Sequence, residues 1–421
     1  MSGTLRVTLT LFVFASMLLL VVLRPRRWNE AWWTVLGASA LLALRLISPA
    51  DAVHATLAGQ SALWFLLSLL LLSLLVGKSG FFDWAAIQCA RVAKGDAHVL
   101  YRNAFLLGAF VTVTLSLDTT AVILTPVVIA LVKRLELPAA PYIVLCAFVS
   151  NVASLLLPIS NLTNILFASA FQLTFAAFAL KMLAPQLVTL ALTYGLLRWS
   201  FRAELPARFA FDSLPSAASV VPSRPYFLAC VSVLACVLAG YFVAPLLGVA
   251  PYVVAFAGVL VLIFFGWATK RVHWSHVREV SWGVFPFVVG LFIAVRGLEQ
   301  LGAGHAAARW FAIDGGGPWG PLLAAGSTAL AANIANNLPA ALLARGVLLE
   351  AHASLGCVLG SLIGANAGSI ITPFGSLATL LVLTSARQQG IEVPAWRLMR
   401  LALWVAPVIV IGATITLTVL N

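Results

Sequence analysis

The chain has 421 residues, of which 62% are hydrophobic and only 9% charged, with a mean hydropathy of +1.05 and a net charge of +12. Soluble domains are about half apolar and a quarter charged, so this composition excludes a soluble globular protein and indicates a polytopic membrane protein. The basic residues lie in short connecting segments, which indicates membrane orientation rather than nucleic-acid binding.

Apolar runs of about 20 residues predict the membrane spans of the first half. The first run is followed at once by basic residues and has no small-residue cleavage site, so we expect a retained helix rather than a signal peptide. A polar patch around Asp118 indicates a re-entrant hairpin, and polar residues interrupt a later span. The predicted elements are spans at 4–23, 31–49, 57–77 and 175–198, a hairpin at 102–134 and a broken helix at 141–171.

The same order of elements recurs after a polar linker at 199–224, so we expect two repeats, 1–198 and 225–421. Each repeat crosses the membrane five times if its hairpin enters and leaves on one side. An odd number of crossings inverts the second repeat, so the predicted fold is an all-α polytopic membrane protein with two inverted repeats. The second repeat is predicted to contain spans at 225–247, 250–269, 281–300 and 398–420, a hairpin at 318–349 and a broken helix at 352–387.

Two apolar segments, 150–162 and 365–377, match without a gap at an offset of 215 residues. Unwound backbone at membrane depth is tolerated only where it is buried in protein or lines a cavity, so paired interruptions of this kind indicate a substrate site. The matched positions are Asn151 with Asn366, Ser154 with Ser369, Pro158 with Pro373, and Leu162 with Leu377.

Lys and Arg residues are unevenly distributed over the predicted loops. Nineteen fall on one side of the membrane, three (Arg6, Arg309 and Arg345) on the other, and three within spans. Because such an excess marks the cytoplasmic side, both termini are predicted to lie outside the cytoplasm. Changing either hairpin into a full span would scramble this asymmetry, which supports the hairpins.

Asp118 is the acidic residue expected to lie deepest in the membrane. A carboxylate near the bilayer centre costs roughly 2.5 to 3.5 kcal/mol on insertion scales and is retained there mainly for function. A compatible structural role is to cap the half-helix of the hairpin. Asp83 and Glu299 lie nearer the ends of spans, and Arg296 is one turn from Glu299. Asp118 is therefore the candidate group for proton coupling.

Neutral polar side chains gather at both hairpins and both broken helices, and the second hairpin offers amides at Asn336 or Asn337 where the first offers Asp118. A second carboxylate would suit a divalent cation, and a basic cluster would suit an anion. The pattern instead predicts a small, neutral, hydroxyl-rich substrate, although any one Ser or Thr is as well explained by helix packing. The predicted substrate-binding residues are Asp118, Thr119, Thr120, Asn151, Ser154, Ser160, Asn161, Asn164, Asn333, Asn336, Asn337, Asn366, Ser369, Thr372, Ser376 and Thr379.

Sequence motifs of enzymes and of bound cofactors are not found. The chain has no GxxxxGK[ST], HExxH or GxSxG pattern, so we expect neither enzyme activity nor a cofactor. Its five cysteines lack CxxC spacing, and we expect no metal site and no disulfide framework.

Four motifs, in this order along nearly the whole chain, resemble those of the bacterial arsenite efflux permeases of the ArsB type. Their combination is more specific than any one of them alone. The motifs are LDTTAVILTPVV at 117–128, PISNLTNI at 158–165, NNLP at 336–339 and ITPFGSLATL at 371–380.

The resemblance implies export of arsenite and antimonite, as neutral trihydroxides, from the cytoplasm in exchange for protons, with Asp118 as the titrating group. It further implies a homodimer surrounded by lipid of the bacterial inner membrane, elevator-like alternating access and, in some members, a soluble arsenite-pump ATPase as partner. Three thiolates would bind arsenic tightly and slow its release. Cys146 and Cys357, which lie outside the four motifs, are therefore secondary candidates as ligands.

Three other functions are weighed against this one. A sodium- or proton-coupled carboxylate or cation transporter of the same superfamily would commonly carry Ser-Asn-Thr at both hairpin tips. The tips here are Leu117-Asp118-Thr119 and Ala335-Asn336-Asn337. A passive membrane anchor has no need of Asp and Asn at the midplane, and a channel would show a sustained current that does not saturate.

Overall fold

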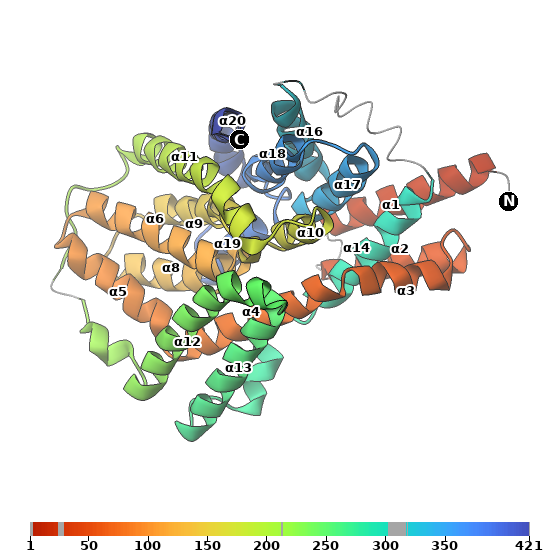
Figure 1. Ribbon diagram of the computed structural model, residues 1–421. Coiled ribbons are helices and arrows are strands. Elements are labelled where there is room, and N and C mark those ends of the chain that lie inside the picture. The colour runs from red at the N-terminus through yellow and green to blue at the C-terminus, as the bar shows by residue number, and fades with distance from the viewer. Residues whose placement is uncertain (1–2, 24–28, 212–213, 302–316, 318, 421) are drawn as a thin grey trace.

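The computed structural model describes residues 3–23, 29–211, 214–301, 317 and 319–420. These residues form helices, with one isolated β-bridge between Asp96 and Arg208 and no strands in the described ranges. Seven of the described helical segments are long and apolar enough to cross a membrane. The chain is therefore an all-α polytopic membrane protein (Figure 1).

The N-terminal part contains two more helices, α3 and α5, than the apolar runs predicted. The helix predicted at 31–49 ends at Ala43, and a separate helix, capped by Ser48, starts at Pro49. A further helix was missed because it is short and carries Asp83 and Arg91. The helices here are α1 (Gly3–Leu23), α2 (Glu30–Ala43), α3 (Pro49–Ala58), α4 (Gln60–Lys78) and α5 (Phe81–Ala93).

A helical hairpin, which we call hairpin 1, follows α5 and turns at Leu115 and Ser116. The turn in the backbone is followed by a π-helical segment, where the Thr125 hydroxyl donates to the carbonyl oxygen of Thr120 at 2.8 Å. Such widened turns are frequent at functional sites. Hairpin 1 comprises α6 (Ala97–Thr114), α7 (Leu117–Thr119), the π segment (Thr120–Leu124) and α8 (Thr125–Arg134).

The next helix is interrupted within the segment predicted to be broken. Helix α9 (Ala139–Val152) unwinds through two 3₁₀ turns, and the chain becomes helical again in α10 (Leu162–Ala170). Asn161 caps α10 by accepting the N–H of Thr163 at 3.2 Å. We call residues 153–161 break 1; α11 (Phe175–Phe201) completes this half.

The second half also contains a helical hairpin followed by an interrupted helix. Hairpin 2 turns at Asn336, and the chain unwinds between α18 and α19 at 367–376, which we call break 2. Gly364 lets α18 approach hairpin 2 closely, because a Cβ there would lie 2.0 Å from the carbonyl oxygen of Ala325. The helices are α12 (Arg224–Val243), α13 (Pro251–Ala268), α14 (Val284–Glu299), α16 (Gly320–Ala335), α17 (Asn337–Glu350), α18 (Leu355–Asn366), α19 (Leu377–Gln388) and α20 (Ala395–Leu420).

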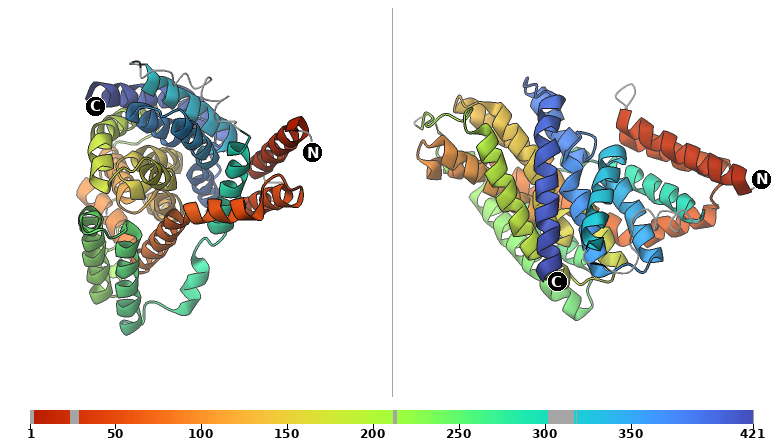
Figure 2. Two further views of the ribbon diagram at one scale, coloured as in Figure 1. Left: turned by 45° about the vertical axis from the view of Figure 1, so that its right-hand side comes forward. Right: turned by 90° about the horizontal axis from the view of Figure 1, so that it is seen from above.

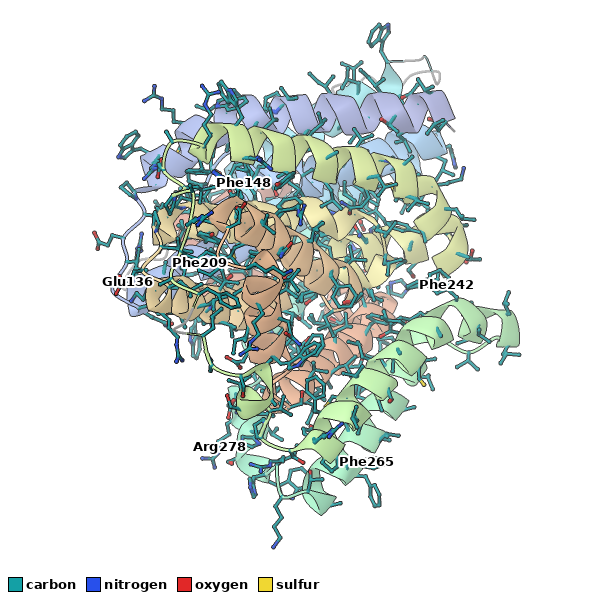
Figure 3. All side chains as sticks on the ribbon, turned by 90° about the vertical axis from the view of Figure 1, so that its left-hand side faces the viewer. Glu136, Phe148, Phe209, Phe242, Phe265 and Arg278 are labelled. Carbon is teal, nitrogen blue, oxygen red and sulfur yellow. The ribbon has the colours of Figure 1, made fainter. Side chains whose placement is uncertain are left out.

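Two apolar clusters hold these helices together. The larger surrounds α9, of which residues 142–149 are at most 1% exposed, and Phe148 lies in the interior in Figure 3. The smaller joins α1, α2 and α14 to Leu166 of α10 and to Leu338 and Leu342 of α17. Helices α1, α2, α3 and α14 therefore form one end of the molecule, away from α5 and α6 (Figures 1 and 2).

Candidate functional site

The two interrupted helices meet in the interior through their amide side chains. The Oδ1 atom of Asn366 accepts from Nδ2 of Asn161 at 2.9 Å and from the hydroxyl of Thr163 at 2.8 Å. The Nδ2 atom of Asn366 donates to Oδ1 of Asn164 at 2.7 Å. All four side chains are buried, so the end of α18 is tied directly to the start of α10.

Several of the predicted substrate-binding residues satisfy the unwound backbone of break 1. Asn164 donates to the carbonyl oxygens of Ser154 at 2.6 Å and Leu157 at 3.0 Å, and the Ser154 hydroxyl donates to the carbonyl of Asn151 at 2.7 Å. The Ser160 hydroxyl donates to the carbonyl of Val113 in hairpin 1 at 2.9 Å. Because a bare carbonyl is costly at membrane depth, these bonds let the helix remain open.

Hairpin 2 is fastened to break 2 in a similar way. Asn333 donates to the carbonyl of Gly368 at 2.7 Å and accepts from the Thr372 N–H at 2.7 Å, while the Thr372 hydroxyl donates to the Asn333 carbonyl at 3.0 Å. Asn336 donates to the carbonyl of Phe374 at 3.0 Å. The tip of hairpin 2 and the unwound chain are therefore mutually satisfied.

Three more of the predicted residues make hydrogen bonds within the protein, two of them near break 2 and one in hairpin 1. The N–H of Asn337 donates to the carbonyl of Gly375 at 2.8 Å. The Ser369 hydroxyl donates to the carbonyl of Asn366 at 3.0 Å. Thr120 shares a hydrogen bond with Thr112 at 2.8 Å inside hairpin 1. In this conformation these three groups form hydrogen bonds with other groups of the protein.

Two predicted side chains retain unused hydrogen-bonding capacity. Asn151 donates to the carbonyl of Ala147 at 2.9 Å and to the Thr379 hydroxyl at 3.1 Å, but its buried Oδ1 has no partner among the described residues. The buried hydroxyl of Ser376 likewise has none there. Buried polar groups are rarely left unpaired, so each is a candidate contact for a water or a substrate.

Asp118 lies beside the turn of hairpin 1 and lines a cavity of about 380 Å³. The Ser116 hydroxyl caps the half-helix by accepting the Thr119 N–H at 3.2 Å, so Asp118 is not needed as the cap. The half-buried carboxyl has no hydrogen bond or ion pair with any described residue. Its neighbour Thr119 also lines the cavity and shares a 2.6 Å hydrogen bond with Ser73 of α4.

One ion pair borders the same cavity. The Nζ atom of Lys78, at the end of α4, lies 2.7 Å from a carboxylate oxygen of Glu279. Most of the remaining wall is apolar and comes from α4, hairpin 1 and α19, including Leu70, Val122 and Leu381. Of the two acids that line this cavity, only Asp118 is free of a cationic partner among the described residues.

The comparisons with known proteins agree over nearly the whole chain. The model of the citrate transporter family CitMHS matches residues 17–362. The arsenical pump membrane protein of Escherichia coli (strain K12) is 30% identical over 399 residues, which cover 90% of this chain and 91% of that protein. That of Yersinia enterocolitica is 31% identical over 405 residues, with the same coverage of each chain. The chain belongs to the ArsB-type permeases of the CitMHS family. It is a membrane transporter and not an enzyme.

Solved structures support the fold of the permease. The YdaH transporter of Alcanivorax borkumensis has a TM-score of 0.63 and 17% identity, with 87% of this chain and 86% of that chain covered. MtrF of Neisseria gonorrhoeae, described as one of a class of antimetabolite efflux pumps, has a TM-score of 0.60 and 13% identity, with 98% and 94% covered. At this identity the likeness concerns the fold alone.

The permease also uses a residue that the motifs do not contain. Gln186, in the middle of α11, accepts the N–H of Leu155 at 2.9 Å and donates to the carbonyl of Val152 at 2.9 Å. It therefore satisfies the backbone where α9 unwinds. The available signal was a single amide beside Pro185 within a mostly apolar span, and polar residues in such spans seldom lack a partner.

The starts of the two half-helices refine the expected equivalence of the hairpins. Ser116 caps α7, and Asn336 caps α17 by accepting the N–H of Leu338 at 3.3 Å. Counted from these caps, Asp118 corresponds to Leu338 rather than to Asn336 or Asn337. The carboxylate of the permease is thus matched by an apolar residue in the other half.

The secondary candidate ligands lie away from this cavity. Cys146 and Cys357 are buried free thiols, and neither lines the cavity that contains Asp118. The hydroxyl of Ser354 donates to the sulfur of Cys357 at 3.3 Å. Among the described residues, no group of three His, Cys, Asp or Glu side chains is arranged to hold a metal ion.

Proposed function

We propose that this permease exports arsenite and antimonite, as neutral trihydroxides, from the cytoplasm in exchange for protons. The observation that carries the proposal is the position of Asp118, a carboxyl without a protein partner in the described structure, on the wall of the 380 Å³ cavity. A proton-coupled carrier needs a group that can gain and lose a proton in its cycle. The names of the arsenical pump membrane proteins to which it is similar support the substrate.

Two buried polar groups of the interior, which are not part of the cavity wall, suit a neutral solute. A trihydroxide donates hydrogen bonds from its O–H groups, and Asn151 Oδ1 and the Ser376 hydroxyl are buried acceptors with unused capacity. The cationic group on the wall, Lys78, is already paired with Glu279. A bound anion would instead require a cation free to face it.

The proposed topology puts the Asp118 cavity toward the cytoplasm. Lys78 and Glu279 belong to the side with the excess of basic residues, which includes Arg278. In the proposed orientation Glu136, at one edge of the molecule in Figure 3, faces the cytoplasm, and Phe242, on the opposite side, faces away from it. Both termini then lie outside the cytoplasm. The proposed location of the protein is the bacterial inner membrane.

We further propose that the two halves are inverted repeats and that the protein is a homodimer. The recurring order of hairpin and broken helix supports the repeats. The hairpins and breaks, joined by the amide contacts around Asn366, would move together against the outer helices in elevator-like alternating access. A soluble arsenite-pump ATPase is a further proposed partner.

Uptake of arsenite into everted membrane vesicles, with and without an imposed proton gradient, tests the proposal. We expect gradient-driven uptake by the wild type and its loss in Asp118→Asn, which removes the titrating group with little change in size. Asp83→Asn is the matched control, because Asp83 lies in the same half but does not line the cavity. Uptake that is absent in the wild type, or that follows a sodium gradient, would contradict the proposal.

A carboxylate transporter is the second candidate, and the description of the CitMHS family as citrate transporters favours it. A tricarboxylate would require several cationic contacts, whereas the cavity offers only the paired Lys78 within the described residues. Competition in the same vesicles separates the two. Citrate that inhibits arsenite uptake, or that is itself taken up, would favour the second candidate.

A further inference from the structure

Two corresponding seams between a hairpin and a long helix differ in packing. In the proposed inverted arrangement, α4 corresponds to α14, hairpin 1 to hairpin 2, and α19 to α10. The seam between α4, hairpin 1 and α19 is open, because it borders the cavity of about 380 Å³ that contains Asp118, whose wall is completed by residues 279–281 and by Val284 at the start of α14. The corresponding seam between α14, α17 and α10 borders a much smaller cavity of about 100 Å³, beside Phe292, Leu342 and Arg345.

Apolar side chains close the second seam. Leu338 and Leu342 of α17 are 7% and 1% exposed and belong to the same cluster as Leu291 and Phe292 of α14 and Leu166 of α10. Leu338 is the residue that corresponds to Asp118 when positions are counted from the helix caps. One half therefore exposes a carboxyl to a cavity where the other buries leucine.

An ion pair lies at the outer end of this closed seam. Arg345 is on the same face of α17 as Leu338 and Leu342, at helical spacings of four and three residues. A guanidinium nitrogen of Arg345 lies 4.0 Å from a carboxylate oxygen of Glu299 in α14, and each side chain is 25% exposed. The contact is close, since a Cβ on Gly346 would lie 3.3 Å from the same carboxylate oxygen.

Glu299 is held in place from its other side. Its second oxygen lies 3.2 Å from Arg296, whose guanidinium is 3.9 Å from Asp51 of α3. A small cavity of about 100 Å³ beside these groups is lined by Leu342, Arg345 and Glu299, so the pair sits where water can reach the seam. Three of the four charged groups thus belong to α3 and α14, and Arg345 alone belongs to hairpin 2.

We infer that the seam between α14 and α17 is the extracytoplasmic gate of the transport path and that the Arg345–Glu299 ion pair holds it shut. This inference rests on the proposed function for its direction and topology. When the α4 seam is open to the cytoplasm, the α14 seam is closed, and substrate release requires α17 to separate from α14. A partly exposed pair is weak enough to break within a cycle. Arg345 and Glu299 are positioning residues, not substrate contacts.

Labelling of a cysteine placed in the seam tests the gate without any substrate. Leu342→Cys is treated in intact cells with a membrane-impermeant maleimide, and the unmodified protein gives the background of the native thiols. We expect little labelling beyond background, because position 342 is buried. Adding Glu299→Gln should raise labelling by up to about fivefold, the population shift that corresponds to losing a partly exposed ion pair.

A second variant that breaks the ion pair and a second labelled position provide independent checks. Arg345→Gln breaks the same pair from the other side, and Val295→Cys reports on the seam from α14. The double variant Glu299→Gln/Arg345→Gln should label no more than Glu299→Gln alone, because Glu299→Gln already removes the pair with Arg345 as well as the pair with Arg296. Glu204→Gln, which breaks the exposed pair between Glu204 and Arg397, is the control and should leave labelling unchanged.

The outcomes separate this inference from the proposed function. Labelling that rises in Glu299→Gln and Arg345→Gln supports the gate even if the vesicles transport no arsenite. Labelling that is already high in the parent, or that is unchanged in both variants, overturns the gate even if arsenite export is demonstrated.

Discussion

The side-chain amide of Asn366 donates to that of Asn164 at 2.7 Å, although the two residues are 202 positions apart. Each of them stands where a long apolar helix is interrupted or resumes, at the end of α18 and in the first turn of α10. The bond therefore joins the two interruptions at one place in the interior. A helix opened at membrane depth can be stable only if its polar groups find such internal partners.

Replacing Asn366 with Ala should destabilise the protein rather than weaken substrate binding alone. The change removes three hydrogen bonds to Asn161, Thr163 and Asn164, each worth about 0.6 to 2 kcal/mol in membrane proteins. We expect a lower apparent Tm in detergent and less folded protein in the membrane. Ser327→Ala on the exposed face of α16 is the control. An unchanged Tm together with a raised KM would show that Asn366 is chiefly a substrate contact.

Sequence patterns could locate the interruptions but not their contacts. Pro158 and Pro373 within apolar runs indicate where helices must open, because proline lacks an N–H and clashes with the preceding turn. No periodicity relates Asn366 to Asn161, since their contact depends on how the two halves pack. For the same reason the sequence could not separate amides that satisfy backbone, such as Asn164, from those with spare capacity, such as Asn151.

Two helices escaped prediction for more local reasons. The predicted span at 31–49 runs past the end of α2 because the apolar run continues through the turn at Arg45, whose φ is 54°, and α3 was missed because it has only 10 residues. Helix α5 has a polar face and only 13 residues, so it falls below the length that marks a span. The position of Asp118 on a cavity wall follows from the π segment and the packing of α4, which composition does not encode.

Replacing Ser376 with Ala should impair transport without harming the fold. Its hydroxyl is buried and has no partner among the described residues, so its removal leaves no other described group unsatisfied. If the hydroxyl contacts substrate, the loss of one hydrogen bond should raise KM by about 2- to 12-fold. The measurement is arsenite uptake by everted vesicles, normalised to folded protein. Unchanged KM in Ser376→Ala would place the substrate elsewhere.

Acid should weaken the start of hairpin 1 through Asp96, which lies outside the spans. The carboxylate accepts the N–H groups of Val99 at 3.0 Å and His98 at 2.8 Å, and these bonds lower the pKa of Asp96 below its ordinary value. A lowered pKa in the folded state means that the stabilisation is present above the unfolded value, near 3.9. It is then lost as the pH falls through the folded value.

The pH dependence of apparent Tm in detergent checks this expectation, with Asp96→Asn as the comparison. Asn also caps helices well but does not titrate, so the variant should lack this component of the acid-induced fall in Tm below about pH 4. The difference in Tm between the wild type and Asp96→Asn should therefore shift against the wild type as the pH is lowered. A constant difference from pH 7 to pH 3 would show that the carboxylate makes no pH-dependent contribution.

Substitutions of Asn336 should separate backbone strain from hydrogen bonding at the tip of hairpin 2. Its φ of 80° and ψ of 153° lie in a region that is populated almost only by glycine and that costs other residues about 1 to 3 kcal/mol. Asn336→Gly and Asn336→Ala both lose the bonds to Phe374 and Leu338, but only glycine relieves the strain. The glycine variant should therefore exceed the alanine variant in apparent Tm, while both should transport more slowly than the wild type because the tip is no longer fastened to break 2. Equal Tm values for the two variants would show that the strained conformation is not maintained at this tip.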